Sequence, residues 1–423
     1  MATDVEVQFF SHLNGLTLGN NQGDLIRLLD KALVTGINFT EITSASINEQ
    51  GDVTINLYAA HNAMLFQIVE LSGFSPASLN QKYRIKGVPS ATQLILKPQN
   101  EIGTTVISTV GAGKLASLGY EIIFRDANDV KSVYRAKNPT AQHPFIRVDE
   151  SLASATGSYT ATYAKYAMVG LLEHMEHIDD YENPDVLQLP FNPSDPAKNW
   201  KITGTGLEVV RGWSRWYFAT AQPFPSGPFE YISPSSGSRH FTLCGDSSAF
   251  YFVPSLGISD HKYKVLYGVG LFESALDSDV VPNWFLFTQL RSDNAGQTTG
   301  FTNYAGGSPL SFSNQQAGFF ATRYSITNPI SSHIFANPII PDLKTGSSNI
   351  YSANNISALE IPFYDDAKHL RGSLKHIYYS GNNKSARVIT TPLLEVSEMY
   401  VQESIWHQGG DTGGIYFYLG CIE

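Results

Sequence analysis

The chain has 423 residues and a formal net charge of −10; charged residues make up 16% and aromatic residues 12%, with 35 glycines and 21 prolines. This balance is typical of β-rich proteins with many turns and argues against a helical bundle. No block of Lys and Arg is present, which excludes nucleic acid as a main partner because phosphate binding needs clustered cations. The length predicts two to four domains.

The sequence shows no targeting or membrane-spanning pattern. Its first residues lack the basic and apolar regions of a signal peptide, and no run of eighteen apolar residues is present. Cys244 and Cys421 lie in no CxxC or Cys/His pattern, so both are expected to be reduced, partly buried thiols. We therefore expect a protein that is made in a cytoplasm and has no membrane partner.

One helix is predicted near the N-terminus, between Asn20 and Gly36. Asn and Asp near its start and a glycine just past its end are common helix boundary residues. Its apolar residues fall on one helical stripe, which predicts that they pack into a core: Leu25, Ile26, Leu28, Leu29, Ala32 and Leu33.

Beyond the helix the apolar period changes to two. Val53, Ile55 and Leu57 alternate with Thr, Asn and Tyr, and similar patterns follow at 83–88 and 93–96. Residues from about 40 to 110 are thus predicted to form a compact antiparallel barrel or sandwich.

The glycine-bearing stretch Val110–Ala116 is interpreted as a linker into the next unit. It does not match a phosphate-binding loop, because Ser108 stands where that motif has its first Gly and Leu115 where its hydroxyl residue belongs. No phosphate ligand is expected here.

Short strand-like runs separated by Gly, Ser, Asn and Pro continue from Tyr120 onward. The aromatic-rich segments Arg211–Ala219 and Ser248–Pro254 are predicted to be paired core strands of one sheet. Pro190–Trp200 is predicted to be a surface excursion between strands. The polar stretch Arg291–Ser313 has neither a helical nor a strand period, and loops of that length usually serve as functional or contact surfaces.

Together these patterns predict a mainly β, multidomain protein of antiparallel sandwiches and small barrels with one N-terminal helix. The expected organisation is an N-terminal helical segment at 1–39, a small barrel-like β-module at 40–112, one or more larger β-sandwich domains with long loops at 113–395, and C-terminal strands at 396–423.

The segment Glu173–Asp180, EHMEHIDD, holds two histidines and four carboxylates and raises the question of a metal site. A zincin helix places its histidines four residues apart, whereas His174 and His177 are three apart. The preceding residues, 159–170, alternate like a strand, and strand residues three apart point to opposite faces. We therefore predict a polar strand end or acidic turn that binds no metal.

The remaining patterns supply no catalytic site. Ser238 lies in the centre of a five-residue window, but Ser236 and His240 stand where a nucleophile elbow requires glycines. Adjacent carboxylates would point apart on strands and are not evidence for glycosidase chemistry: Asp149-Glu150, Asp179-Asp180 and Asp365-Asp366.

Four tryptophans could stack sugars on a fibre or lectin face, but tryptophans within strands are more often core residues: Trp200, Trp213, Trp216 and Trp284. We expect no enzyme activity, no catalytic residue and no cofactor.

Several segments in chain order resemble a widespread group of tailed-bacteriophage virion proteins. The first is Gly23–Gly36, where that group has a Trp-Gly start, a Leu/Asp-rich helix and a closing glycine; here Gln22 replaces the tryptophan. The second comprises residues 60–74 and 79–88, which are similar to small β-modules of phage particles.

The third resemblance is the most specific and follows four strand-like segments. They look like a Gly-aromatic-Glu strand, a Tyr-Arg strand, an Arg-Val-Asp strand and a strand ending in Met: Leu118–Phe124, Val133–Pro139, Phe145–Glu150 and Tyr166–Met175. Tyr120 replaces the usual tryptophan. Arg211–Phe218 and Leu370–Tyr379 resemble later segments, so the resemblance spans most of residues 15–380.

The resemblance implies a non-enzymatic structural component of a tailed phage particle, in the tail, collar or baseplate. It also implies location in the virion, assembly in the host bacterial cytoplasm, and contacts with copies of itself in a symmetric assembly and with other virion proteins. None of the matching motifs is catalytic, and the group implies no metal at Glu173–Asp180. Two alternatives stay open: a capsid decoration protein, and a carbohydrate-binding receptor protein at the tail tip.

Overall fold

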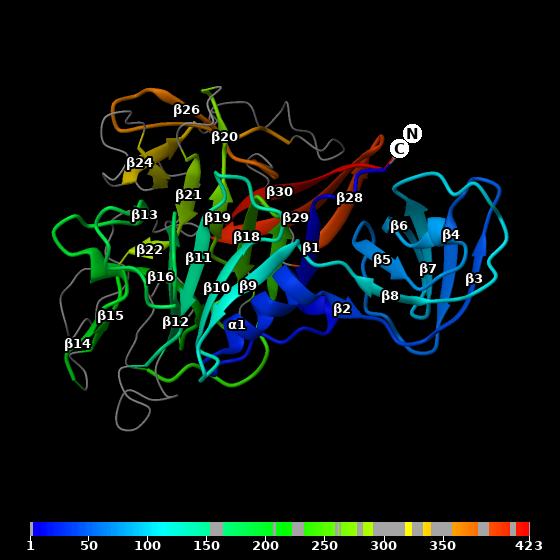
Figure 1. Ribbon diagram of the computed structural model, residues 1–423, viewed down its shortest axis with the longest axis horizontal. Coiled ribbons are helices and arrows are strands. Elements are labelled where there is room, and N and C mark those ends of the chain that lie inside the picture. The colour runs from blue at the N-terminus through cyan, green and yellow to red at the C-terminus, as the bar shows by residue number, and fades with distance from the viewer. Residues whose placement is uncertain are drawn as a thin grey trace.

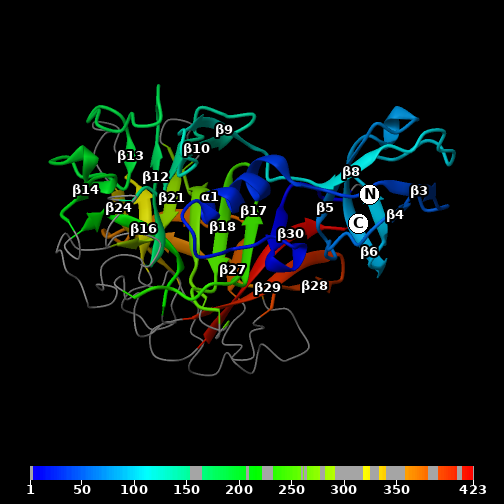
Figure 2. The ribbon, with the colours of Figure 1, turned by 90° about the horizontal axis from the view of Figure 1, so that it is seen from below.

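The computed structural model describes residues 3–152, 164–205, 209–221, 232–258, 261, 264–276, 282–290, 318–323, 333–339, 358–379, 389–406 and 412–422. Within these ranges the chain is mostly β-strand, in curled antiparallel sheets, with one α-helix near the N-terminus. The predicted fold class is confirmed. Figures 1 and 2 show a small β-module beside a larger body. No helix of the described residues is long and apolar enough to cross a membrane.

The small β-module is a seven-stranded antiparallel sheet. Its strands, in sheet order, are β2 (Ile37–Asn38), β8 (Ala112–Leu115), β5 (Ile68–Ser72), β6 (Lys82–Ser90), β7 (Gln93–Pro98), β4 (Val53–Leu57) and β3 (Ile42–Ile47), and a 3-10 turn, Ala77–Leu79, precedes β6. Val53, Ile55 and Leu57 are buried while the residues between them are half-buried, as their alternation predicts.

The interpretation of Val110–Ala116 as a linker is wrong. Four of these residues form β8, which pairs with β5 on one side and β2 on the other. Gly113 fits there because a Cβ atom would lie only 3.0 Å from Leu71 and 3.2 Å from Phe39. Lys114 forms an ion pair with Glu70 on β5 at 3.2 Å. The stretch that leads out of the module is therefore part of its sheet.

The larger body contains two more antiparallel sheets. The ten-stranded sheet has the order β1 (Gln8–Ser11), β17 (Phe241–Gly245), β18 (Ala249–Pro254), β19 (Tyr267–Leu271), β21 (Trp284–Phe287), β23 (Phe319–Thr322), β24 (His333–Pro338), β25 (Pro362–Tyr364), β26 (Leu370–Ser373) and β20 (Glu273–Ser274). The other has the order β22 (Gln289–Leu290), β16 (Ser214–Ala219), β12 (Lys165–Leu172), β11 (Phe145–Asp149), β10 (Lys131–Ala136) and β9 (Tyr120–Arg125), with β13 (Gln188–Leu189) also on β12.

The predicted pairing of Arg211–Ala219 with Ser248–Pro254 is wrong, although both are core strands. β16 and β18 belong to different sheets and meet across the core. The Trp216 ring lies 6.3 Å from that of Phe252, stacked, and 6.1 Å from that of Phe250, edge to face. A strand buried on both faces has no alternation that identifies its neighbour, so pattern cannot separate pairing from packing.

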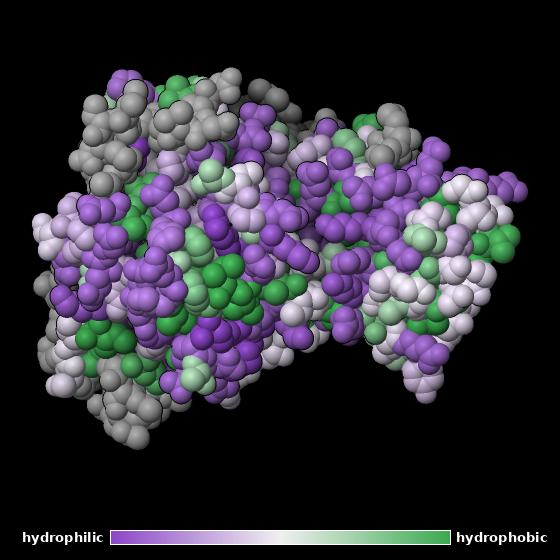
Figure 3. Space-filling view, in the orientation of Figure 1, coloured by the Kyte–Doolittle hydropathy of each residue, from purple (hydrophilic) through white to green (hydrophobic). Residues whose placement is uncertain are grey.

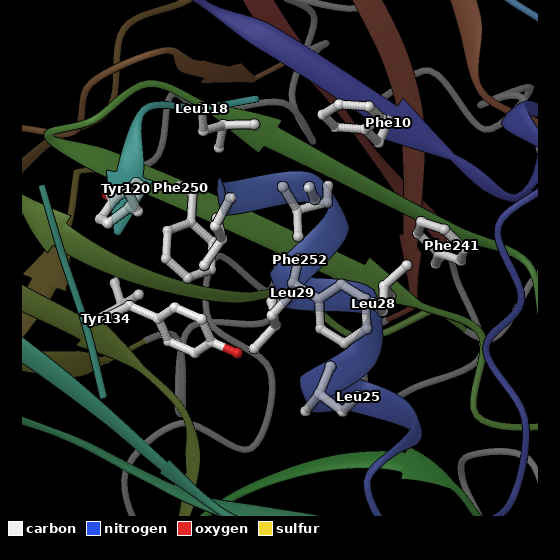
Figure 4. Close-up of a cluster of buried hydrophobic side chains, with 14 of the residues drawn as sticks. Phe10, Leu25, Leu28, Leu29, Leu118, Tyr120, Tyr134, Phe241, Phe250 and Phe252 are labelled. Carbon is white, nitrogen blue, oxygen red and sulfur yellow. The ribbon is translucent and has the colours of Figure 1, made fainter. Parts of the chain in front are cut away.

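The predicted helix is present and packs between the sheets of the body. It comprises α1 (Asp24–Leu29) and a π-helical continuation, Asp30–Thr35, and Gly36 follows with φ of 71°. All six residues of the predicted stripe are buried. Figure 4 shows three of them among aromatic residues of the ten-stranded sheet: Leu25, Leu28 and Leu29 with Phe241, Phe250 and Phe252.

Glu150, directly after β11, caps this helix from more than a hundred residues away. The N-cap position is Gly23, which has no side chain to accept a hydrogen bond. The Glu150 carboxylate instead accepts the N–H of Ile26 at 2.8 Å and that of Gly23. The side chain is fully buried, and this burial raises the pKa of Glu150 to about 8.

The C-terminal strands form a four-stranded sheet with the order β27 (Ile377–Tyr379), β30 (Thr412–Cys421), β29 (Glu398–Trp406) and β28 (Thr391–Glu395), and β14 (Ile202–Thr203) pairs with β15 (Val210–Arg211). The ends of the described chain meet beside the small module (Figures 1 and 2): the Asp4 N–H donates to the Cys421 carbonyl at 2.9 Å. Both cysteines are free thiols; Cys421 is half-buried, as predicted, whereas Cys244 is fully buried rather than partly buried.

Candidate functional site

The segment EHMEHIDD lies where the sequence predicts. β12 ends at Leu172 and a turn follows, so the predicted strand end is confirmed. Met175 is buried, whereas the His174 side chain is 63% exposed. Among the residues that the structure describes, no three His, Cys, Asp or Glu side chains are arranged to hold a metal. The absence of a bound metal stays a prediction, which elemental analysis of the purified protein tests.

Arg147 on β11 holds this turn in place. Its guanidinium is fully buried, donates to the Ile178 carbonyl at 2.7 Å and to the Asp179 carboxylate at 2.6 Å, and lies 4.4 Å from the centre of the Trp200 ring. Lys131 also donates to Asp179, at 2.9 Å. Burial opposes ionisation of Asp179, but the two cations outweigh it and lower the pKa of this carboxyl. Asp179 therefore serves as an anchor for the turn.

A cleft of about 270 Å³ opens between the loop after β13 and the β14–β15 hairpin. Two ammonium groups and one carboxylate give it a positive balance within a chain of net charge −10. Its lining is mainly polar: Asn192, Asp195, Lys198, Lys201, Thr203, Val210 and Gly212.

Asn199 and Gly212 support the floor of the cleft. The Asn199 amide donates to the Val169 carbonyl at 3.0 Å and accepts the Ser214 N–H at 2.7 Å. Gly212 has φ of 61°, and a Cβ atom there would lie 2.5 Å from the Asn199 carbonyl. The predicted surface excursion at Pro190–Trp200 is exposed only in its middle, because its two ends are buried in the body.

The cleft offers charged groups and hydrogen-bonding groups. Lys201 forms an ion pair with Asp195 at 3.3 Å, and the Lys198 ammonium lies 4.8 Å from the centre of the Trp213 ring. The described lining residues include no cysteine, histidine or serine. This arrangement suits reversible binding of a small polar or anionic group.

Three of the four tryptophans considered in the sequence analysis are core residues, as predicted. Trp200, Trp216 and Trp284 are at most 5% exposed. Trp213 is half-buried, and its ring contacts the Lys198 ammonium and the Phe320 ring. These four side chains therefore offer little open aromatic surface on which a sugar could stack.

The other motifs tested in the sequence have structural partners. The Ser238 hydroxyl accepts the Leu18 N–H at 3.3 Å. Asp149 forms an ion pair with Arg147 at 3.0 Å while Glu150 caps the helix, so these adjacent carboxylates do point apart. Arg291–Ser313 lies outside the described residues.

Sequence reasoning missed a set of buried polar residues that joins the small module to the body. Arg84 on β6 is fully buried. Its guanidinium donates to four main-chain carbonyls, those of Asp4 (2.8 Å), Val7 (3.0 Å), Phe66 (2.7 Å) and Leu419 (2.9 Å). The sequence offered one signal for this residue, an arginine between the apolar residues Tyr83 and Ile85 in a predicted strand. An arginine that points to solvent from a strand gives the same pattern.

Two glutamines complete this module junction. Gln8 on β1 donates to the carbonyls of Ile68 (2.9 Å) and Ala116 (2.8 Å) and accepts the Ile68 N–H at 2.9 Å. Gln67 donates in the opposite direction, to the Phe9 carbonyl at 2.7 Å. Both side chains are fully buried. Because the directional bonds of Arg84, Gln8 and Gln67 connect the module to the N-terminal strand and to β30, they set its orientation on the body.

Comparisons with known proteins leave the family of this chain open. No protein-family model matches it. No curated protein matches it either. Among solved structures, the phage phi92 endosialidase matches at 11% identity over 92% of this chain and 51% of that chain, with a TM-score of 0.14. The chain thus spans about half the length of that protein, and a match at this TM-score carries no argument about fold or function.

Proposed function

We propose that this chain is a non-enzymatic structural component of a tailed phage particle, in the tail, collar or baseplate, and that it acts through protein–protein contacts. The observation that carries the proposal is the module junction. Buried hydrogen bonds of Arg84, Gln8 and Gln67 hold two β-rich parts at one angle. A preorganised pair of surfaces suits an assembly built from repeated identical contacts. The segment resemblance at 118–175 points to the same class.

An apolar edge strand supports this proposal. β28 is the last strand in the order of the four-stranded sheet, and Ile389, Leu394 and Val396, on it or beside it, are 49%, 50% and 95% exposed. An edge strand with exposed apolar side chains favours pairing with another chain. Figure 3 shows a further apolar patch in the middle of one face, over β9, the edge strand of the body sheet that contains β16 and β12. The proposed partners are copies of this chain in a symmetric assembly and other virion proteins.

The two alternative functions, capsid decoration and carbohydrate binding, would use different surfaces of the protein or different places in the particle. A capsid decoration protein would use the same edges and differs only in its place in the particle. A carbohydrate-binding receptor protein would use the polar cleft beside Lys198 and Lys201, because the tryptophans are buried or already in contact. The cleft alone is a weaker basis than the junction and the edge strand together.

Purified particles of a phage that encodes this chain test the proposal. Mass spectrometry should find the protein at a fixed copy number, and a particle reconstruction should place it around a symmetry axis of the tail. Density on the capsid would select the decoration alternative, and purified particles without the protein would overturn the assignment to a virion.

A substitution on β28 distinguishes loss of an assembly contact from loss of folding. Leu394→Lys should leave the melting temperature within about 2 °C and lower incorporation into particles, because it places a charge on the β28 edge. Val106→Lys, at a 68% exposed apolar residue on a loop of the small module, is the matched control. Equal incorporation of both variants would exclude β28 as a contact surface.

Partial deletion of Arg291–Ser313, the loop proposed from the sequence as a contact surface, tests that loop in the same incorporation assay.

A further inference from the structure

Three histidines from distant parts of the chain form a column of stacked rings, here called the histidine column. The rings of His12 and His240 have centres 3.7 Å apart and planes 12° apart, and those of His240 and His261 have centres 3.4 Å apart and planes 4° apart. His12 lies in the 3-10 turn His12–Asn14 that follows β1, His240 directly precedes β17, and His261 lies between β18 and β19. The column therefore joins the N-terminal segment to the ten-stranded sheet.

Among the residues that the structure describes, a buried ion pair lies near the column. Lys264 and Glu403 are fully buried and lie 2.5 Å apart. Glu403 also accepts hydrogen bonds from Thr242 on β17 and from Thr390, the latter at 3.0 Å. Lys264 disfavours a proton on His12 and His240, while Glu403 favours one on His12. Glu403 is therefore already paired with Lys264 and with two threonine hydroxyls.

A proton on His240, the middle ring of the column, is costly. Burial, then the neighbouring rings and Lys264, lower the pKa of His240 to about 4, and burial lowers the pKa of His12. The buried Nδ1 of His240 has no hydrogen-bond partner among the described residues, so a proton there would be unsatisfied. At neutral pH the His240 ring is uncharged, and it stacks between the other two rings. An imidazolium in the middle of the column would face two other rings and lie near an ammonium group.

We propose that the histidine column is an acid-sensitive contact that holds the N-terminal segment on the body at neutral pH and releases it on acidification. His12 follows β1, which pairs with β17 from Gln8↔Gly245 to Ser11↔Thr242. Gln8 on the same strand bonds the backbone of the small module. Opening the column thus loosens both the edge of the ten-stranded sheet and one side of the module junction. This inference concerns the fold alone and does not rest on the proposed place in a virion.

The direction of the pH effect follows from the lowered pKa. Because the folded pKa lies below the value near 6.5 of a free histidine, the stabilisation is complete above about pH 6.5 and is lost as the pH falls toward 4. If the pKa of His240 changes fully from about 4 in the closed column to 6.5 in the open state, the equilibrium constant for opening rises about 30-fold at pH 5. Partial exposure of the ring reduces this, so an increase of about tenfold is expected.

Hydrogen exchange of the N-terminal segment tests the proposal. After correction for intrinsic rates, exchange of a peptide spanning residues 3–14 should rise about tenfold between pH 7.5 and pH 5 in the unaltered protein. His240→Phe keeps a flat ring in the column but cannot take up a proton, so its change should stay within about twofold. His174→Phe, at an exposed histidine outside the column, should behave as the unaltered protein. Equal responses of the His240→Phe variant and the unaltered protein would overturn the proposal.

A measurement on the unaltered protein guards against misfolding of that variant. NMR titration of the histidine ring signals should show at least one ring of the column that stays neutral well below pH 6. Titration of His12, His240 and His261 all near pH 6.5 would overturn the proposal whatever the variants do.

Discussion

Replacing Arg84 tests whether the small module is held at a set angle. Arg84→Met keeps most of the side-chain volume but removes the donors to four buried carbonyls. Each buried acceptor that loses its partner costs about 1–3 kcal/mol. Part of the total cost for the four carbonyls is offset, because the structure relaxes locally, water can enter, and the desolvation cost of the buried guanidinium is removed. A loss of about 3–5 kcal/mol in the free energy of unfolding is therefore expected, similar to the loss of one partner from a buried ion pair.

Urea denaturation followed by tryptophan fluorescence measures this loss. The matched control is Lys114→Met in the same sheet, where the side chain is 33% exposed and pairs with the 44% exposed Glu70 at 3.2 Å; about 0–1 kcal/mol is expected there. Arg84→Lys retains the charge but lacks the planar guanidinium that reaches four carbonyls. Its loss in free energy of unfolding should therefore lie between those of Arg84→Met and the control. A loss below about 1 kcal/mol for Arg84→Met would refute the reasoning, because the junction bonds would then not hold the module.

Two further predictions concern the N-terminal helix. Leu28→Ala should lower the free energy of unfolding by about 2–5 kcal/mol, because Leu28 is 2% exposed within the core; an unchanged denaturation curve would contradict this packing. Glu150→Gln should destabilise most at low pH. The raised pKa of Glu150, about 8 against an ordinary 4.5, means that its contribution is complete below about pH 4.5 and declines as the pH rises to 8. Denaturation measured at pH 6 and at pH 9 should therefore show that the difference in free energy of unfolding between the variant and the unaltered protein is smaller at pH 9. A difference that is the same at both pH values would argue against the raised pKa.

The sequence by itself determined the features that depend on local pattern. The stripe from Leu25 to Leu33 predicted the helix, because burial of one helical face imposes a period of 3.6 residues. The alternation at Val53–Leu57 predicted a strand with one buried face. The spacing of His174 and His177, read with the strand before them, correctly placed EHMEHIDD at a strand end. These features need only the chemistry of residues a few positions apart.

Only the tertiary structure decided which distant segments meet. β16 and β18 are each buried throughout, so nothing in their composition indicates that they face each other from different sheets. Gly113 was read as part of a linker because a glycine looks the same in a flexible connection and in a closely packed strand. Arg84, Glu150 and His240 each have a partner more than a hundred residues away. Such contacts depend on directional bonds and close packing across the folded chain, and these form only where the sheets bring the residues together.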